Sequence, residues 1–545
     1  MAQYIQIGTL LLPNNLTVNA HGNGYADPNI LIPAVIEAVT VDGGAFNVRE
    51  GNHAVDLATV YSLRSRLAPF VTLTGDRRDI DVSVGWRDIA LETSFGDGLL
   101  RAPERRRQYK LNAIRGITRG RHDLTFLGIG YSGESSVPGL VPLGDPNDTL
   151  DPRQHDHTHT AEAAVNDVWM LNRDSQLQLS GFARTYSLAL ESNFGSGLIR
   201  QSEFRTVAGG NTTYIKTVNQ RLTIMAGADF TRDAPRHLDL DRYDPFRRIT
   251  SNDVTIELLS PYAAIDGAVT RWLRYDIGWR RDQIRFDNRD LLQSANSFHA
   301  GMPVDSPKAT LTLAPPENTL APEVALSYGQ SFFTLDPRIG IENGVRGSPV
   351  ARAHSYQLVI IKRVYGAELR AVFGRVNEEQ SLAKIDPDTG LQFNQGPSRN
   401  RYVSFSARRR FRAGSLAISL AKADARDLAS GLPVPEAPRL IFDALGSLER
   451  LPFHLRSQAE YEAIGRKPLG DGLTSVPVHQ LRGSLVRMFH EGRLEGGLLF
   501  LIASGYTGQT TEVLAWPAAS AVSERIVGVR IPSYAGLSFT YRPRP

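Results

Sequence analysis

The sequence predicts an all-β protein: a transmembrane antiparallel β-barrel of about 22 strands with a partial plug at its N-terminal end. Three features predict this fold. Apolar and polar residues alternate with period two in many short segments, and the connections between these segments are short and long in turn. The first 65 residues follow neither pattern. Amphipathic helical segments are nearly absent.

The composition excludes several classes of protein. The chain has 545 residues, 61 Lys and Arg against 57 Asp and Glu, a net charge of +4 and no Cys. Without Cys it has neither a disulfide framework nor a thiolate metal site, and the nearly balanced charge does not predict nucleic-acid binding. No apolar run reaches the roughly 18 residues of a membrane helix. A strand that crosses a membrane needs only about ten alternating residues, so a barrel is not excluded.

The alternating segments are typical of strands with one apolar and one polar face. Successive side chains of a strand point to opposite faces. The polar positions carry Ser, Thr, Asp, Glu and Arg, as expected for strands with water on one side. The clearest examples are residues 80–86, 222–230, 403–412, 415–420 and 537–542.

The connections indicate how the strands are joined. Short turns are expected at 171–174, 315–319, 412–415 and 490–493, and long loops at 133–158, 233–250, 290–306 and 336–353. Counting strands in this way gives roughly 22 between Arg66 and Pro545, with short turns on one rim and long loops on the other. A barrel of that size encloses a lumen wide enough to need a plug. We therefore expect residues 66–545 to form the barrel.

Residues 1–65 are expected to form a small lobe inside the barrel. Pro28, Pro33 and several glycines divide this segment into short pieces. It is too long for a barrel turn and too short to form a stable domain alone. Its first 15 residues lack the basic segment and the cleavage site of a secretory signal. Either the protein is therefore cytoplasmic, or this sequence begins downstream of the true start of the protein.

The lobe and the strand count together resemble TonB-dependent outer-membrane receptors. Residues 36–61 (IEAVTVDGGAFNVREGNHAVDLATVY) are similar to the second half of the plug in this family, with a short strand, a Gly turn, a loop from Phe46 to Gly51, and a last strand that enters the barrel. Residues 16–33 resemble the plug loop of a subgroup with a His-Gly-x-Gly-Tyr-Ala-Asp signature. Residues 327–338 (SYGQSFFTLDPR) and the aromatic last strand are similar to barrel segments of these receptors.

The chain also departs from the family pattern. Asp42-Gly43-Gly44 stands where the family has Arg-Gly-Pro, Val55-Asp56 stands where it has a Gly pair, and the chain ends in Arg-Pro-Arg-Pro rather than in an aromatic residue. The signal peptide, the TonB-contacting box and the first half of the plug have no counterpart, so residues 1–65 are expected to be a partial plug.

The resemblance implies a transport function in the outer membrane of a bacterial cell. The expected substrate is a bulky, scarce nutrient such as a siderophore or another metal chelate, imported by TonB-dependent active transport. The implied partners are the TonB complex, whose contact region is missing from this chain, the small-molecule or metal-chelate ligand, and outer-membrane lipid. Two alternatives remain: a passive porin-like channel and, from another class, a soluble β-rich carbohydrate-binding protein.

Three alternating histidines form one candidate binding site. His155, His157 and His159 lie in the segment QHDHTHT at the end of the longest expected loop. In an extended segment, the three imidazoles lie on one side, close enough to share a transition metal or a metal chelate. A solvated, His-rich loop is the alternative interpretation.

A second candidate site lies in the plug. His21, Asn23, Tyr25 and Asp27 are expected to contact the ligand, because the resemblance places such loops at the top of the plug. Alternatively, Gly22 and Gly24 form a tight turn that His21 and Asp27 hold in place.

No catalytic set is recognisable, so the protein is not expected to be an enzyme, and no cofactor is expected. The letters Gly128-x-Gly130-x-x-Gly133 match a dinucleotide-binding fingerprint. No helix follows them and no βαβ unit surrounds them, so the phosphate-binding geometry is absent.

Overall fold

The computed structural model describes most of the chain. The described residues are 3–7, 12–13, 15–19, 24–98, 102–137, 141–142, 149, 151–193, 197–316, 319–339, 341–342, 345–346, 349–385, 392–435, 437–470, 473–505, 526–527 and 532–543.

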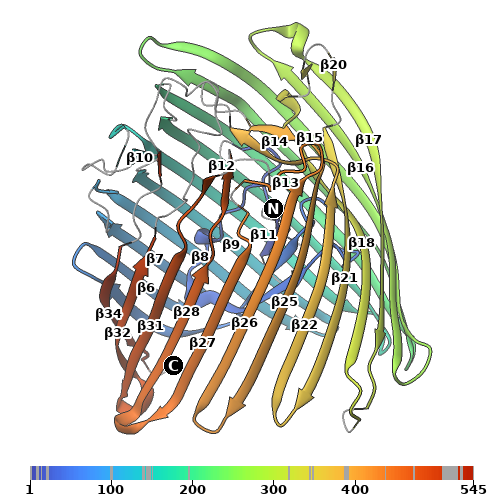
Figure 1. Cartoon of the computed structure of the whole chain (residues 1–545), viewed down its shortest axis with the longest axis vertical. Coiled ribbons are helices and arrows are strands. Elements are labelled where there is room, and N and C mark those ends of the chain that lie inside the picture. The colour runs from blue at the N-terminus through green and yellow to red at the C-terminus, as the bar shows by residue number, and fades with distance from the viewer. Residues whose placement is uncertain are drawn as a thin grey trace.

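One closed barrel of 22 antiparallel strands surrounds the N-terminal segment (Figure 1), which confirms the predicted fold class and strand count. Each strand pairs with its neighbours in chain order, and the ring closes where β34 pairs with β5. The first eleven strands are β5 (Leu67–Gly75), β6 (Asp79–Arg87), β7 (Ile89–Gly96), β8 (Arg106–Arg119), β9 (His122–Ser136), β11 (His155–Met170), β12 (Ser175–Asn193), β13 (Leu198–Asn219), β14 (Leu222–Arg242), β15 (Arg247–Ala268) and β16 (Leu273–Asp290). The other eleven are β17 (Phe298–Leu313), β18 (Glu323–Thr334), β21 (Val350–Val364), β22 (Ala367–Glu378), β25 (Ser398–Phe411), β26 (Gly414–Asp427), β27 (Leu440–Leu451), β28 (Leu455–Ile464), β31 (Val478–Phe489), β32 (Leu494–Ser504) and β34 (Tyr534–Tyr541).

The remaining short elements lie in the connections. Four two-stranded sheets are formed by β10 (Val141–Pro142) with β33 (Ile526–Val527), β19 (Ile341–Glu342) with β20 (Val345–Arg346), β23 (Ser381–Ile385) with β24 (Gln392–Gln395), and β29 (Pro468–Gly470) with β30 (Leu473–Thr474). The 3₁₀ turns are η3 (Ser294–Asn296), η4 (Pro337–Ile339), η5 (Pro452–His454) and η6 (His490–Gly492). Within the described residues, no helix is long and apolar enough to cross a membrane.

Short turns gather at one rim and most long connections at the other, as the sequence predicts. The expected long loop at 233–250 is wrong, because β14 continues to Arg242 and β15 begins at Arg247. A register shift between Asp233 and Leu238 interrupts the alternation there and hides the strand in the sequence. The connections expected at 290–306 and 336–353 are also shorter, since β17 begins at Phe298 and β21 at Val350.

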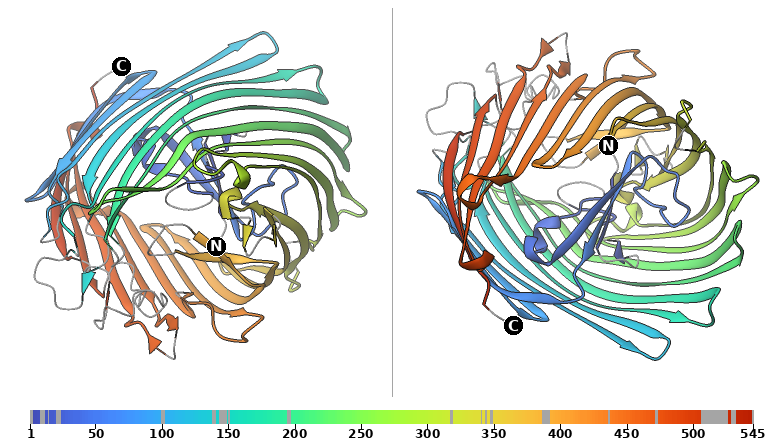
Figure 2. Two further views of the ribbon diagram at one scale, coloured as in Figure 1. Left: turned by 90° about the horizontal axis from the view of Figure 1, so that it is seen from above. Right: turned by 90° about the horizontal axis from the view of Figure 1, so that it is seen from below.

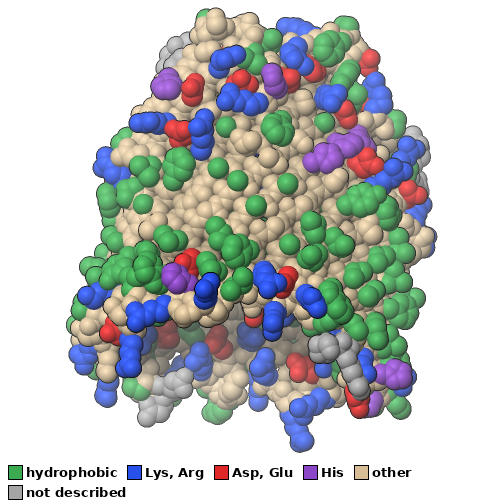
Figure 3. Space-filling view, turned by 180° about the vertical axis from the view of Figure 1, so that it is seen from behind, with side chains coloured by type: hydrophobic (Ala, Val, Ile, Leu, Met, Phe, Trp, Pro, Cys, Tyr) green, Lys and Arg blue, Asp and Glu red, His purple; other side chains and the backbone are tan. Residues whose placement is uncertain are grey.

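The outer face of the wall is apolar. Leu259, Ile277 and Leu326 point outward and are 51%, 54% and 59% exposed. On the face drawn in Figure 3, charged side chains gather towards the two ends of the wall, and few lie in the zone between them. Exposed aromatic side chains stand near the short-turn rim, as at a membrane interface; they include Trp86, Trp169, Trp272, Phe411, Phe489 and Tyr541. A single closed wall with an apolar outside is not the pair of packed sheets expected for the alternative of a soluble β-rich carbohydrate-binding protein.

The N-terminal segment forms a small sheet inside the ring (Figure 2). Its strands are β1 (Gln3–Ile7), β2 (Leu12–Pro13), β3 (Ile36–Gly43) and β4 (Leu57–Leu63), in the order β2-β1-β4-β3. Strand β1 runs parallel to β4, and β3 pairs antiparallel with β4. We call this segment, residues 3–63, the plug. The chain then passes from β4 directly into the first barrel strand, β5.

Apolar packing fixes the plug against one part of the wall. Two 3₁₀ turns, η1 (Pro28–Ile30) and η2 (Pro33–Val35), bury Ile32 and Val35 among side chains of β8, β9 and β12. Asn112 on β8 accepts a hydrogen bond from the backbone N–H of Ile32 (2.8 Å) and donates one to the carbonyl of Ile30 (3.1 Å). The plug is thereby held by its side and not only by its covalent link to β5.

Candidate ligand-binding crevice between plug and wall

Two loops of the plug contact the wall towards the long-loop rim. Plug loop 1 comprises the described residues 15–19 and 24–27, and plug loop 2 comprises residues 44–55. Plug loop 1 closes on itself, since Gly24 donates to the carbonyl of Leu16 (2.7 Å) and Leu16 donates to the carbonyl of Tyr25 (2.8 Å). Asp27 then caps η1 by accepting from the N–H of Asn29 (2.8 Å).

A buried ionic cluster on the wall holds plug loop 1. The Arg205 side chain is 0% exposed and lies between Glu203 (2.6 Å) and Asp233 (2.9 Å). Asp233 also accepts from the backbone N–H of Thr17 (3.0 Å) and from its hydroxyl (2.8 Å). Arg205 donates to the carbonyl of Val18 as well. Because every charge in this cluster is paired, its burial is tolerated, and the plug loop completes the hydrogen bonding.

Plug loop 2 is held through its backbone. Lys308 on β17 is 1% exposed and donates to the carbonyls of Asn47 (2.8 Å) and Glu50 (2.7 Å). Next to it, the backbone N–H of His53 donates to the carbonyl of Phe332 on β18 (2.9 Å). The Asn52 side chain exchanges hydrogen bonds with Thr334 (2.9 and 3.1 Å). The loop therefore continues the hydrogen-bonding pattern of the wall.

Two titratable groups of plug loop 2 are perturbed by burial. Burial lowers the pKa of His53 to about 4, so its imidazole is neutral at physiological pH. Burial raises the pKa of Glu50 to about 7, although the Lys308 ammonium acts in the opposite direction. Both shifts follow from the cost of a charge that has lost its water.

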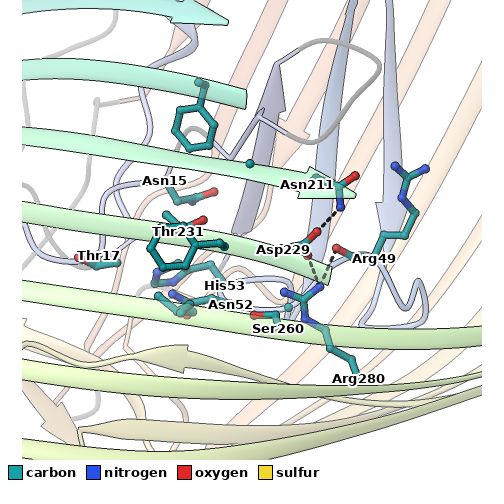
Figure 4. Close-up of a pocket in the computed structure, with 15 residues that line it drawn as sticks. Asn15, Thr17, Arg49, Asn52, His53, Asn211, Asp229, Thr231, Ser260 and Arg280 are labelled. Atoms are coloured by element: carbon teal, nitrogen blue, oxygen red, sulfur yellow. Dashed lines mark hydrogen bonds and ion pairs between the residues drawn. The ribbon is translucent and has the colours of Figure 1, made fainter. Parts of the chain in front are cut away.

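Between the two plug loops and the wall lies a hollow lined by both polar and apolar side chains (Figure 4). Figure 4 shows Arg280 and Asn211 converging on Asp229, which the wall supplies from β14. The other polar lining comes from both partners: Asn15, Thr17, Arg49, Asn52 and His53 from the plug, and Thr231 and Ser260 from the wall. Phe182 and Leu258 add apolar surface.

Three buried polar atoms of this hollow have no hydrogen-bond partner among the described residues. They are Nε and Nη2 of Arg49 and Oγ of Ser260. Buried polar groups are normally paired. The Arg280 guanidinium is neutralised by Asp229 and Asp282, whereas no ion pair of Arg49 is present in the described structure. The hollow is therefore suited to a polar ligand with a negative charge or with hydrogen-bond acceptors.

The structure places two of the four predicted plug residues. Tyr25 and Asp27 line a second, smaller hollow, together with Thr158 and Thr160 on β11 and Tyr186 on β12. Burial raises the pKa of the Tyr25 hydroxyl far above its usual value, with the nearby Asp27 carboxylate adding to the effect. His21 and Asn23 lie outside the described residues. The ligand contact of these four residues stays a prediction.

The three histidines lie on the other side of the same strand. Along β11 the even-numbered Thr158, Thr160 and Glu162 are buried against the interior, so His155, His157 and His159 point outward. Adjacent rings are 5.6 and 5.2 Å apart, centroid to centroid. The wall thus separates the histidines from Tyr25 and Asp27, and the two predicted groups do not form one site.

Sequence reasoning missed the residues that line the hollow. Arg49 is part of the plug-loop segment that carries the family resemblance, but nothing marks it as unpaired. The inward positions of β13, β14 and β16 carry Arg205, Asp229 and Arg280. In the sequence, Arg and Asp at such alternating positions were interpreted only as side chains that face water. A signal was available in the charge-rich inward positions of β13 to β16, which suggest ion pairs across neighbouring strands.

Comparison with solved structures supports the fold. No protein-family model matches the chain, and no curated protein matches its sequence. The ferric citrate transporter FecA in its unliganded form aligns with a TM-score of 0.79 and 12% identity, over 99% of this chain and 88% of that one. The ferric yersiniabactin uptake receptor FyuA from Yersinia pestis gives 0.72 and 12%, over 99% and 88%. The ferric-catecholate import receptor Fiu from E. coli K12 gives 0.71 and 11%, over 92% and 85%.

At these identities the likeness shows the fold alone. The chain has the plug-and-barrel architecture of the TonB-dependent receptors, and the resemblance drawn from its sequence is confirmed at that level.

Proposed function

We propose that this protein is an outer-membrane receptor that imports a bulky, scarce nutrient of the siderophore or metal-chelate class by TonB-dependent active transport. The observation that carries the proposal is the hollow between plug and wall, because it offers a ligand polar contacts from both the plug and the wall. A ligand that binds there touches Arg49 and His53 of the plug together with Ser260 and Asn211 of the wall.

The chemistry of the hollow supports a chelate as substrate. Metal chelates of the siderophore type present many oxygen acceptors and often carry a negative charge. Arg49 has two buried nitrogens without a partner among the described residues, and amide and hydroxyl groups surround it. FecA, FyuA and Fiu are described as a ferric citrate transporter, a ferric yersiniabactin uptake receptor and a ferric-catecholate import receptor. Their likeness in fold supports the same substrate class here.

The transport step would be mechanical rather than catalytic. Plug loop 1 and plug loop 2 are held by hydrogen bonds and ion pairs on β13 to β18, so a ligand can compete for these contacts. Binding would loosen the plug, and a pull by the TonB complex would then move it away from the wall. The barrel remains rigid because all its strands are paired and no edge is open.

A second candidate is the passive channel. Strands β27 and β28 contain no buried residue among those described, whereas the inward side chains of β13 are mostly buried. The described plug therefore covers only one side of the lumen wall. Steady conductance of the reconstituted protein in planar bilayers would favour this channel over a gated receptor.

A binding measurement tests the proposal. The full chain, purified in detergent, is titrated with ferric citrate and with a ferric catecholate, and binding is followed by quenching of tryptophan fluorescence. We expect saturable binding to at least one chelate, weakened about tenfold or more by Arg49→Ala because a charged hydrogen bond contributes about 1.5–3 kcal/mol. Arg289→Ala, on the outward face, is the matched control. Binding of neither chelate, or equal loss in both variants, would contradict the proposal.

A further inference from the structure

A second cluster of potential metal ligands lies on the outside of the barrel, away from the hollow between plug and wall. Glu134 near the end of β9 stands directly opposite His157 at the start of β11. His155 precedes His157 by two residues and lies on the same face of the strand. All three side chains are half-buried on the outward surface of the wall. One potential ligand atom from each lies within 4.8 Å of the other two.

The height of this cluster on the wall follows from the strand that carries it. Trp169 is exposed at the short-turn end of β11, and a strand crosses the hydrocarbon core in about 9–11 residues. Counted from Trp169, the apolar crossing ends near His159. His155 and His157 therefore stand just beyond the apolar zone, where water and ions reach the wall.

We propose that Glu134, His155 and His157 bind a divalent transition-metal ion, such as Zn²⁺, Ni²⁺ or Cu²⁺, on the outer surface of the barrel. Two imidazoles and one carboxylate are a ligand set that these ions favour, and the same set with an additional water completes a four-coordinate site. The site is separate from the lumen, because the barrel wall lies between it and the crevice.

The geometry needs only small side-chain movements. Ligand atoms around a tetrahedral zinc ion lie about 3.3 Å apart, given bond lengths of about 2.0–2.1 Å. Nε2 of His157 is already 3.7 Å from Oε2 of Glu134. Rotation of the half-exposed His155 side chain can supply the remaining approach. Arg107 pairs with the other oxygen, Oε1 of Glu134 (3.3 Å), so Oε2 is left for the metal.

The expected consequence is a clip between two neighbouring strands. The long connection between β9 and β11 leaves and returns at this point, since β9 ends at Ser136 and β11 begins at His155. A metal that joins Glu134 to both histidines would hold the base of this connection together and stabilise the rim by an amount that grows with the logarithm of its affinity.

The test uses the full chain without a polyhistidine tag, purified in detergent and stripped with a chelator. Zn²⁺ binding is measured by calorimetry, and Cu²⁺ by electron paramagnetic resonance. We expect one Zn²⁺ per chain and a Cu²⁺ spectrum with coupling to two imidazole nitrogens. His157→Ala and Glu134→Gln should each weaken Zn²⁺ binding by about tenfold or more, since loss of even an outer-shell partner has an effect of that size.

His122→Ala is the matched control. His122 lies on the same strand pair at the opposite end, where it contacts Asp167 (2.8 Å), but it belongs to no group of three metal-ligating side chains within the described part of the chain. We expect its Zn²⁺ affinity to equal that of the parent. Heat-modifiable migration on gels verifies that each variant is folded. Failure of the folded parent to bind Zn²⁺, or binding that His157→Ala and Glu134→Gln leave unchanged, would overturn the proposal.

Discussion

Gly24 of plug loop 1 lies directly against the imidazole of His53 in plug loop 2. A Cβ atom at Gly24 would be 2.5 Å from Nδ1 of His53, and the glycine has a φ of +72° that disfavours any other residue. The two loops therefore meet at a position that only glycine can occupy without displacing His53. The position of one loop depends on the position of the other.

This contact predicts that Gly24→Ala separates the plug loops. The added methyl group forces His53 away from its place beside Thr334, so the hollow between plug and wall changes shape. We expect chelate binding to fall by about tenfold or more, because a displaced contact in a binding site contributes about 1–3 kcal/mol. Gly366→Ala is the control, since Gly366 has the same φ of +72° with nothing within 4 Å of its Cβ position. Equal effects of both variants would mean that backbone strain alone is responsible.

Arg205 is predicted to be the main polar anchor of plug loop 1. Replacement by Met leaves Glu203 and Asp233 buried without a compensating charge, which costs about 3–5 kcal/mol. We expect the plug of Arg205→Met to become sensitive to limited proteolysis while the barrel remains resistant. Arg232→Met removes a half-exposed pair with Glu257 on the outer face, and such a pair contributes about 1 kcal/mol or less. An equally protected plug in both variants would rule out the anchoring role.

The His53 imidazole predicts that acid weakens the plug. Its pKa is about 4 in the folded protein and 6.5 ordinarily, so the unfolded chain binds more protons between these values. The stabilising contribution is complete above pH 6.5 and is lost as the pH falls through 4. A shift of this size corresponds to about 3 kcal/mol. Proteolysis of the plug as a function of pH measures it.

His53→Gln should flatten this acid dependence, since the amide does not titrate in the range. Glu50 acts in the opposite direction, because its pKa of about 7 in the folded protein exceeds the ordinary 4.5. Its contribution to the stability of the plug is therefore complete below pH 4.5 and is lost as the pH rises through 7. Glu50→Gln should therefore make the dependence on His53 easier to see. An acid response that His53→Gln leaves intact would refute the assignment.

The outward face of the wall predicts sensitivity to charge at mid-height. Ala263 is exposed on the outer face of β15, five residues from its short-turn end and so midway along the roughly 9–11 residues that cross the hydrocarbon core. An arginine on the lipid face costs about 2–4 kcal/mol at the midplane and about 0–1 kcal/mol near an interface. We expect Ala263→Arg to lower the free energy of unfolding in lipid vesicles by the larger amount. Val218→Arg, at the short-turn end of β13, should have the smaller effect. Equal effects at both positions would contradict a membrane-spanning wall.

The strand pattern was predictable because burial on one side imposes a period of two. Residues 222–230 show this clearly: Asp229 points inward to Arg280, and Phe230 is exposed outward. The prediction failed at 233–250, where a bulge changes which side chains face inward. Periodicity assigns a residue to one of two faces but does not show which face is the outer one. His155, His157 and His159 were expected together on one side of an extended segment at the end of a long loop, and the structure places them on the outward face of β11.

The candidate crevice could be predicted only in part. Plug loop 1 was expected to contact the ligand from the family resemblance, and Tyr25 and Asp27 do lie between plug and wall. Arg205 and Arg280 pair with acids of the wall, partly only two residues away in the sequence, and these patterns were interpreted only as a wet face. Arg49 was not identified, because its place beside β14 to β16 depends on which strands the plug contacts.

Uptake by whole cells tests the central claim most directly. Cells that lack their own iron receptors and express this chain are given radioactive ferric citrate and a radioactive ferric catecholate, with and without a functional TonB complex. The account predicts saturable uptake of at least one chelate that is lost when TonB is removed. Uptake that rises linearly with concentration and does not depend on TonB would contradict active import and identify a passive channel.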